Sequence, residues 1–204
     1  MPVPTISTAE SGWRARAVSL LPDRGARVRV VAVEGRSGSG KSTVAGHLRA
    51  ALEARGEPVH VLAMEDFYPG WDGLARAPYL LRSQVLDPLR RGEPAAWHPY
   101  DWERGAFAPE WIRLPEEVAA GGTLVVEGCG SGAAGVRDLV DALVWVAVPG
   151  AERARRLDTR WDAAVYAPHR DRWARQEEAF YAEHRPRAHA GLIVDNTGAL
   201  TPDG

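Results

Sequence analysis

One short segment constrains the fold of this chain more than any other: residues 35–42 read Gly-Arg-Ser-Gly-Ser-Gly-Lys-Ser. They fit the phosphate-loop pattern G-x-x-x-x-G-K-[ST] at each fixed position. An apolar run, 28–33, precedes the segment, and a helix-compatible run, 43–54, follows it. A strand, a glycine-rich loop and a helix in this order are the context in which the pattern holds phosphate. The segment therefore predicts that the chain binds a nucleoside triphosphate.

The residues of this loop have separate expected roles. Glycines let the backbone turn tightly and aim N–H groups at an anion, and the helix N-terminus adds a partial positive charge. Lys41 can reach the β- and γ-phosphates, and Ser42 can ligate Mg²⁺. We therefore expect ATP and Mg²⁺ as cofactors. The residues expected to hold the nucleotide are Gly35, Ser37, Gly38, Ser39, Gly40, Lys41, Ser42 and Thr43.

The composition sets the broad class of protein. The chain has 204 residues, of which 45% are hydrophobic, and its formal net charge is −2. These values are typical of one globular domain, and the near-neutral charge gives no reason to expect nucleic acid or a membrane as partner. The single cysteine, Cys129, fits a reducing compartment. No signal-peptide pattern opens the chain, so we expect a cytoplasmic protein, with a homo-oligomer left open.

Alternating apolar and helix-compatible runs predict an α/β fold. The continuous apolar character of the strands suits buried parallel strands. We therefore expect the three-layer α/β/α fold of phosphate-loop nucleotide hydrolases, with a mostly parallel central sheet and a helical lid. The expected strands are 28–33, 59–64, 123–127, 143–148 and 191–195, and the longer expected helices are 43–54, 80–91 (interrupted near Pro88), one from 151, and 171–183.

The same patterns suggest how the domain is divided. Residues 1–26 are expected to form an N-terminal extension, with a loose tail at 1–8 and a short helix after it. The remainder, 27–204, would be the phosphate-loop domain. Within it, we expect an acceptor-binding insertion at about 69–113 and a lid at about 151–170.

Acidic residues come at the carboxyl ends of two predicted strands. Glu65 and Asp66 follow the second strand, and Glu127 ends the third. Ligands of open α/β sheets bind at this edge. One of the adjacent acids could take a proton from an acceptor hydroxyl or contact Mg²⁺ in its outer shell, and these residues alone do not decide which. Glu127 is placed where a nucleotide site needs a second Mg²⁺ contact beside Ser42.

Aromatic residues gather in the expected insertion, which contains Trp71, Trp97, Trp102 and Trp111. On loops beside a ligand-binding edge, such side chains could form a pocket for the acceptor. They could equally pack as a satellite core under long loops. Both interpretations stay open for each tryptophan.

A row of arginines follows the fourth strand, from Arg153 to Arg160. Guanidinium groups pair with oxyanions in a forked geometry, so these side chains could belong to a lid that closes on phosphates. They could also form a solvated helix face with local acidic partners. Arg156 and Arg160 are the better lid candidates. The polar loop at 196–198 could contact adenine or be a plain turn.

Taken in order from Val28 to Gly198, these motifs resemble the uridine kinase, phosphoribulokinase and nicotinamide riboside kinase group of phosphate-loop kinases. Residues 65–68 look like the family's D-x-F-Y segment, in which the first acid is the catalytic base. Alignment on Phe67 and Tyr68 gives Glu65 that place. The resemblance also implies that Glu127 contacts Mg²⁺. The acceptor-binding residues that it implies are Tyr68, Tyr100, Asp101 and Trp102.

This chain departs from the family in the acceptor half. Uridine kinases carry a His five residues after the tyrosine that matches Tyr100, and this chain has Gly105 there. Their ribose-binding Asp has no counterpart in 75–79, and the arginine run of their lid is represented only by Arg156 and Arg160. We therefore expect a kinase that moves the γ-phosphoryl of ATP to a hydroxyl of a nucleoside-like or other small metabolite. The alternative is an ATP-binding regulatory or interaction module without such transfer.

Overall fold

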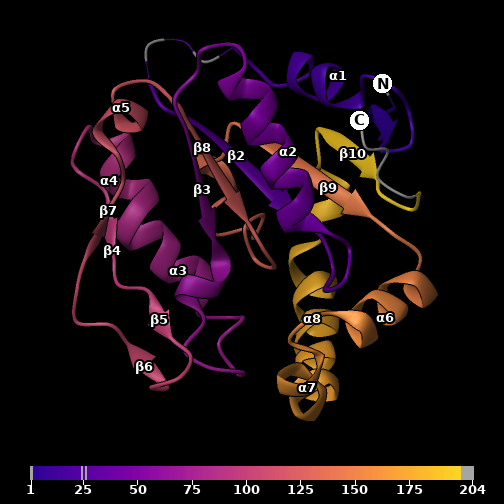
Figure 1. The fold of residues 1–204 in the computed structure, drawn as a ribbon. Helices are drawn as coiled ribbons and strands as arrows, with labels where there is room; N and C mark the ends of the chain where they lie inside the picture. The colour runs from indigo at the N-terminus through magenta and orange to yellow at the C-terminus, as the bar shows by residue number, and fades with distance from the viewer. Residues whose placement is uncertain (1, 24, 26, 199–204) are drawn as a thin grey trace.

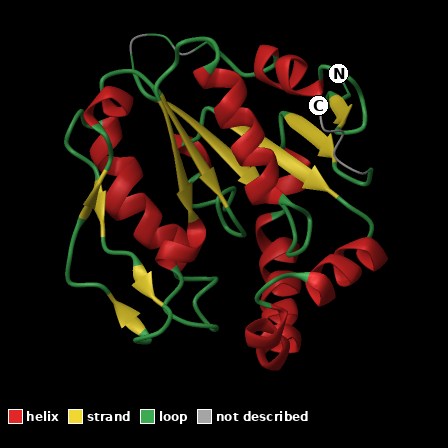
Figure 2. Cartoon of the chain, viewed as in Figure 1, coloured by secondary structure: helices red, strands yellow, loops and turns green. Residues whose placement is uncertain are grey.

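The computed structural model describes residues 2–23, 25 and 27–198. Within them, a six-stranded sheet forms the centre, with helices on both faces (Figure 1, Figure 2). Its strands, in spatial order, are β1 (Thr5–Ser7), β10 (Leu192–Asp195), β9 (Ala142–Ala147), β2 (Arg29–Glu34), β8 (Thr123–Glu127) and β3 (Val59–Ala63). Each neighbouring pair is parallel. The helices are α1 (Trp13–Ser19), α2 (Lys41–Glu53), α3 (Ala77–Leu81), α4 (Asp87–Arg90), α5 (Glu116–Ala119), α6 (Gly150–Thr159), α7 (Ala163–Tyr166) and α8 (Arg170–His184).

Each face of the sheet carries its own apolar core, because successive strand residues point to opposite faces. Val31 and Val33 of β2 pack in the cluster that α1 and α2 cover. Val30 and Ala32 belong to the cluster on the other face, to which α3 and α8 contribute. Strands buried on both faces explain the continuous apolar runs. The expected three-layer α/β/α fold is confirmed.

The first residues of the chain are not the loose tail that the sequence analysis expects. β1 lies parallel to β10, with Thr5 opposite Ile193 and Ser7 opposite Asp195. Ile6 is buried in the core, and so is Trp13 at the start of α1. One apolar residue between two polar ones is too short a pattern to indicate a strand. The strand conformation depends on pairing with β10 and on the burial of Ile6, neither of which is a local property of the sequence.

The segment between β3 and β8 fills the left side of Figure 1. It opens with a 3₁₀ turn, Met64–Phe67, and its longest helical stretch runs from α3 through a π-helical turn at Arg82–Leu86 into α4. The expected interruption near Pro88 thus takes the form of a π-helical turn, because proline lacks an N–H for the regular ladder. Two antiparallel pairs follow, β4 (Ala96–Trp97) with β7 (Ile112–Arg113), and β5 (Tyr100–Asp101) with β6 (Ala106–Phe107).

The expected lid spans α6, α7 and a 3₁₀ turn at Ala167–His169, below the sheet in Figure 1. α8 then leads back to the sheet, and a 3₁₀ turn at Pro186–His189 joins it to β10. Another 3₁₀ turn, Arg137–Leu139, lies between β8 and β9. None of the helices described is both long and apolar enough to cross a membrane.

Candidate active site

The main cavity lies where the strand order changes direction. After β2 the chain forms β3, which is at one edge of the sheet, and then β8, which lies between β3 and β2. The next strand, β9, lies on the opposite side of β2. Ligands of open α/β sheets bind at such a switch point, outside the carboxyl ends of the strands. A cavity of about 1010 Å³ occupies this position. It brings together the phosphate loop, the ends of β3 and β8, and the lid.

Two glycines of the phosphate loop have backbones that other residues adopt only with strain. Gly38 has a φ of 79° and Gly40 a φ of 83°, both in the left-handed region. A Cβ on Gly38 would lie 2.6 Å from the carbonyl oxygen of Arg153, and one on Gly40 would lie 2.5 Å from Nδ2 of Asn196. The loop is therefore fitted closely against α6 and the end of β10.

Most of the residues expected to hold the nucleotide line this cavity. They are Ser37, Gly38, Gly40, Lys41, Ser42 and Thr43. Gly35 and Ser39 are not part of the lining. Gly35 packs against the backbone of Val146. Ser39 is buried, and among the residues described its hydroxyl has no hydrogen-bond partner.

Ser42 and Glu127, the expected Mg²⁺ ligands, lie together. The Ser42 hydroxyl donates a hydrogen bond of 2.9 Å to Oε1 of Glu127. Burial raises the pKa of Glu127, although Lys41 and Ser42 oppose the rise. A hydroxyl and a carboxylate oxygen are ligands that suit Mg²⁺, which usually binds one or two protein groups together with phosphate and water. A divalent cation here would also compensate a carboxylate that burial disfavours.

Lys41 is the cation at the centre of the phosphate half, the part of the cavity that the phosphate loop and the tip of β8 form. Its ammonium group donates to the carbonyl oxygen of Arg36 at 3.3 Å. Burial lowers the pKa of Lys41, but the surrounding acidic groups, Glu177, Glu127 and Glu34 among them, raise it and prevail. The amine therefore stays protonated at neutral pH and can neutralise phosphate charge.

Glu34, which the sequence analysis does not single out, ties the loop after β8 to the phosphate loop. Its buried carboxylate accepts the N–H groups of Gly35 at 2.9 Å, Gly130 at 2.8 Å and Gly132 at 3.0 Å. The Tyr181 hydroxyl donates to it at 2.8 Å. Burial raises the pKa of Glu34, and these donors oppose the rise. The sequence does contain a signal for Glu34: an acidic residue ends an apolar strand directly before the phosphate loop.

Glu177 of α8 is a second buried carboxylate that sequence reasoning missed. It accepts the backbone N–H of Ser37 at 2.9 Å and the Ser37 hydroxyl at 2.5 Å. Nε1 of Trp173 donates to it at 3.2 Å and Sγ of Cys129 at 3.1 Å. Burial raises the pKa of the Cys129 thiol, so the thiol stays protonated and can donate. No local pattern links Ser37 to a residue 140 positions later.

The adjacent acids Glu65 and Asp66 point to different places, because a 3₁₀ turn carries both. Glu65 lines the main cavity. Asp66 does not line it, and its carboxylate accepts Nε1–H of Trp97 at 2.8 Å. Burial raises the pKa of Asp66, and the hydrogen bond from Trp97 opposes the rise. Of the two, Glu65 is the carboxylate that a ligand in the cavity can reach.

Aromatic side chains form much of the cavity lining. The ring of Trp71 stacks on His169 at 4.4 Å and meets Trp102 edge-on at 5.0 Å. The indole N–H of Trp102 donates to the carbonyl oxygen of Glu65 at 3.3 Å. The aromatic lining residues are Tyr68, Trp71, Trp102, Trp161, Tyr166 and Trp173. The insertion and the lid segment therefore share this wall.

The four expected acceptor residues divide into two pairs. Tyr68 and Trp102 line the cavity, and the Tyr68 hydroxyl donates to the carbonyl of Cys129 at 2.7 Å. Tyr100 and Asp101 are absent from the lining. Tyr100 packs edge-on behind Trp102 at 5.2 Å. Asp101 caps a turn by accepting the N–H groups of residues 103 and 104.

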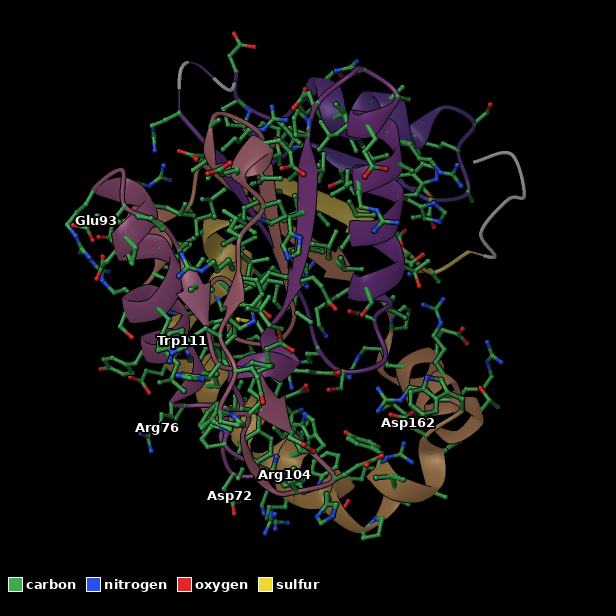
Figure 3. The ribbon with its side chains drawn as sticks, turned by 60° about the vertical axis from the view of Figure 1, so that its left-hand side comes forward. Asp72, Arg76, Glu93, Arg104, Trp111 and Asp162 are labelled. Carbon is green, nitrogen blue, oxygen red and sulfur yellow. The ribbon has the colours of Figure 1, made fainter. Side chains whose placement is uncertain are left out.

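The tryptophans of the insertion also divide by role. Trp71 and Trp102 line the cavity, whereas Trp97 is buried and holds Asp66. Trp111 is exposed and packs on His98 with ring centres 3.7 Å apart. Figure 3 shows Trp111 on the outer side of the insertion, away from Asp162 of the lid. The pocket interpretation thus fits Trp71 and Trp102, and the packing interpretation fits Trp97 and Trp111.

Both lid candidates, Arg156 and Arg160, line the cavity. Arg156 donates to Glu152 at 2.8 Å and to the carbonyl oxygen of Asn196 at 2.7 Å. Arg160 pairs with Asp162 and lies over the ring of Tyr166 at 5.1 Å. Hydrogen bonds from Arg155 and Arg156 lower the pKa of Glu152 to about 2. The arginines thus pair with acidic residues of the lid. Their guanidinium groups could leave these carboxylates and pair with phosphate oxygens instead.

Two solved structures resemble this chain over nearly its whole length. One is described as a possible uridine kinase from Bacillus stearothermophilus, with a TM-score of 0.65, 19% identity, and coverage of 89% of this chain and 97% of that one. The other is described as a putative fructose transport system kinase from Silicibacter sp. TM1040, with a TM-score of 0.54, 24% identity, and coverage of 91% and 97%. No family model and no curated protein matches the sequence. At these identities the likeness establishes the fold alone, a mostly parallel sheet between two helical layers.

Proposed function

We propose that this chain is a kinase that transfers the γ-phosphoryl group of ATP to a hydroxyl of a small molecule. The observation that carries the proposal is that Lys41, Ser42 and Glu127 line the same cavity as Glu65. Phosphoryl transfer requires positioning and charge stabilisation more than covalent chemistry. The names of the two similar structures, both kinases, also support it.

The phosphate half would bind and stabilise the nucleotide. Backbone N–H groups of the loop and the helix N-terminus would surround the phosphates, and Lys41 would neutralise charge that builds up on the transferred group. Ser42 and Glu127 would hold Mg²⁺, which supplies charge neutralisation at the phosphate oxygens. Thr43 and the loop at 196–198, which also line the cavity, would flank the rest of the nucleotide.

Glu65 would act as the base. It would accept the proton of the acceptor hydroxyl while that oxygen bonds to the γ-phosphorus and the bond to ADP breaks. Its place in the lining supports this role, whereas Asp66 is engaged by Trp97. The aromatic wall of Trp71, Trp102 and Trp173 would hold the rest of the acceptor.

The lid would neutralise charge and exclude water. Arg156 and Arg160 line the cavity from α6 and the turn after it. Guanidinium groups at this position suit phosphate oxygens. Exclusion of water favours transfer to the acceptor over hydrolysis.

The experiment is an acceptor screen. The purified chain is incubated with Mg²⁺ and ATP in the presence of nucleosides, sugars and vitamins, uridine and fructose included, and ADP release is measured. A kinase gives ADP release that depends on one acceptor, together with a phosphorylated product seen by mass spectrometry. Equal slow hydrolysis with every acceptor would favour the alternative, a nucleotide-dependent module, which has no need of Glu65 or an aromatic acceptor half.

A further inference from the structure

A second cavity, of about 540 Å³, lies at the carboxyl ends of β9 and β10. Among the residues described, its lining shares only Thr197 with that of the main cavity. The size falls within the range of small-molecule pockets, roughly 300–1,000 Å³. Apart from Thr197, its described lining residues have no role proposed for the nucleotide or the acceptor.

Three arginines from three separate segments line this second cavity. They are Arg36 of the phosphate loop, Arg153 of α6 and Arg187 of the turn before β10. Guanidinium groups that converge from distant parts of a chain form a site for an oxyanion, because each presents forked N–H donors. Segments this far apart in sequence meet here only through the fold.

These guanidinium groups retain donors for a ligand. Within the part of the chain that the structure describes, the side chain of Arg187 makes no hydrogen bond or ion pair. Arg153 donates one hydrogen bond, from Nη1 to the carbonyl oxygen of Ser37 at 3.1 Å. Arg36 pairs with Glu178 at 2.8 Å, but that carboxylate is mostly exposed. Five N–H donors per guanidinium leave several unused at Arg153 and Arg187.

Acidic groups cancel only part of this charge, through the pair of Arg36 with Glu178. Asp195 is the one carboxylate residue among the described lining. Its Oδ1 accepts the backbone N–H of Thr197 at 3.0 Å and also the hydroxyl of Thr197. The wall therefore carries three guanidinium groups against one carboxylate that is already engaged.

Half of the described lining residues are apolar. The end of β9 and the residues after it contribute most of them, and β10 adds a side chain. These apolar lining residues are Trp145, Val146, Ala147, Val148, Pro149 and Ile193. A concave site that combines apolar side chains with convergent polar groups can hold a ligand that has both kinds of surface.

We propose that this second cavity binds a small anion that carries a flat or apolar group, as an aromatic or aliphatic phosphate does. The three arginines hold the anionic group, and the wall around Trp145 and Ile193 receives the apolar part. The competing interpretation is that the arginines only extend the nucleotide site, and the test separates the two.

The test uses phenyl phosphate as the probe and isothermal titration calorimetry as the measurement. All titrations use the full chain with Lys41→Ala, which weakens binding at the phosphate loop. In that background Arg187→Gln removes a charge that lines only the second cavity, and Arg55→Gln removes one from an exposed arginine that lines neither cavity. Melting temperatures check that all variants are folded. Inorganic phosphate lacks the ring, and benzyl alcohol lacks the charge.

We expect phenyl phosphate to bind more tightly than inorganic phosphate and benzyl alcohol. Arg187→Gln should weaken it about fivefold or more, as expected for loss of a charge-assisted contact, and Arg55→Gln should change it less than twofold. The proposal is overturned if phenyl phosphate does not bind the Lys41→Ala chain. It is equally overturned if Arg187→Gln has no more effect than Arg55→Gln. Binding of inorganic phosphate or of benzyl alcohol as tight as that of phenyl phosphate would also overturn it.

Discussion

The two halves of the main cavity are built in different ways. The phosphate half consists of a loop between consecutive elements, β2 and α2, and the tip of the adjacent strand β8. Its expected ligating groups are backbone N–H groups, the Lys41 ammonium group and short polar side chains. The acceptor half consists of large aromatic side chains from the insertion and from α7 and α8, such as Trp71 and Trp173. Phosphate binding is therefore a local property of the chain, whereas acceptor recognition depends on contacts between distant segments.

The largest effect is expected in the phosphate half. Lys41→Ala removes the cation that neutralises the transferred phosphoryl group, and should lower kcat/KM by about 10³-fold, as loss of a preorganised electrostatic group does. Arg49→Ala on the same helix, at an exposed position, is the matched control and should keep wild-type activity. Steady-state kinetics check both variants. Retention of more than a tenth of the activity by Lys41→Ala would separate phosphate binding from catalysis.

The next effect lies where the halves meet. Glu65→Gln removes the proton acceptor and keeps the shape, so kcat should fall by about 10²–10⁴-fold with the affinity for ATP unchanged. Asp66→Asn should keep kcat within about threefold, because Asp66 faces Trp97 rather than the cavity. Turnover and ATP titration check both. The reverse outcome, with Asp66→Asn inactive, would make Asp66 the base.

A smaller effect is expected in the acceptor half. Trp71→Ala removes a ring that contacts Trp102 and His169. It should raise the KM for the acceptor about tenfold, in line with the worth of aromatic contacts, and leave the KM for ATP unchanged. Trp111→Ala, at an exposed site outside the cavity, is the control. An equal rise in both KM values after Trp71→Ala would show that the halves are not separate.

The smallest effect concerns stability and pH. Because burial raises the pKa of Glu127 in the folded state, its carboxylate form destabilises the fold above that pKa. Glu127→Gln without Mg²⁺ should therefore raise Tm at pH 8, by about 2–4 °C for each kcal/mol relieved. The gain should shrink as the pH falls towards the ordinary carboxyl pKa, about 4.3. Thermal melts from pH 5 to 8 measure it. A lower Tm at pH 8 would mean that Lys41 outweighs burial.

The same contrast explains how much could be predicted from the sequence. The strand, loop and helix around Lys41, and the strand that ends at Glu127, follow from local apolar patterns and glycine spacing. β1 could not be predicted, because three residues gain their strand conformation only from the edge of β10. The bond between Ser37 and Glu177 could not be predicted either, because it joins segments that meet only after folding.

In the acceptor half, sequence reasoning placed residues in the right segment, but the residue pattern alone did not decide which neighbours face the cavity. Glu65 and Asp66 are neighbours in the chain, and only the 3₁₀ turn separates their directions. Tyr100 and Trp102 are likewise two positions apart, and only Trp102 lines the cavity. Side-chain direction in short strands and turns depends on packing, which motif spacing does not report.

Transfer of labelled phosphate tests the central claim most directly. ATP labelled in the γ-phosphoryl group is incubated with Mg²⁺ and an acceptor from the screen, in a single turnover, with wild-type chain and with Glu65→Gln. The account predicts that the wild-type chain moves the label to a hydroxyl of the acceptor and that Glu65→Gln binds ATP but does so at least 10²-fold more slowly. Label that appears only as inorganic phosphate, at the same rate in both proteins, would contradict it.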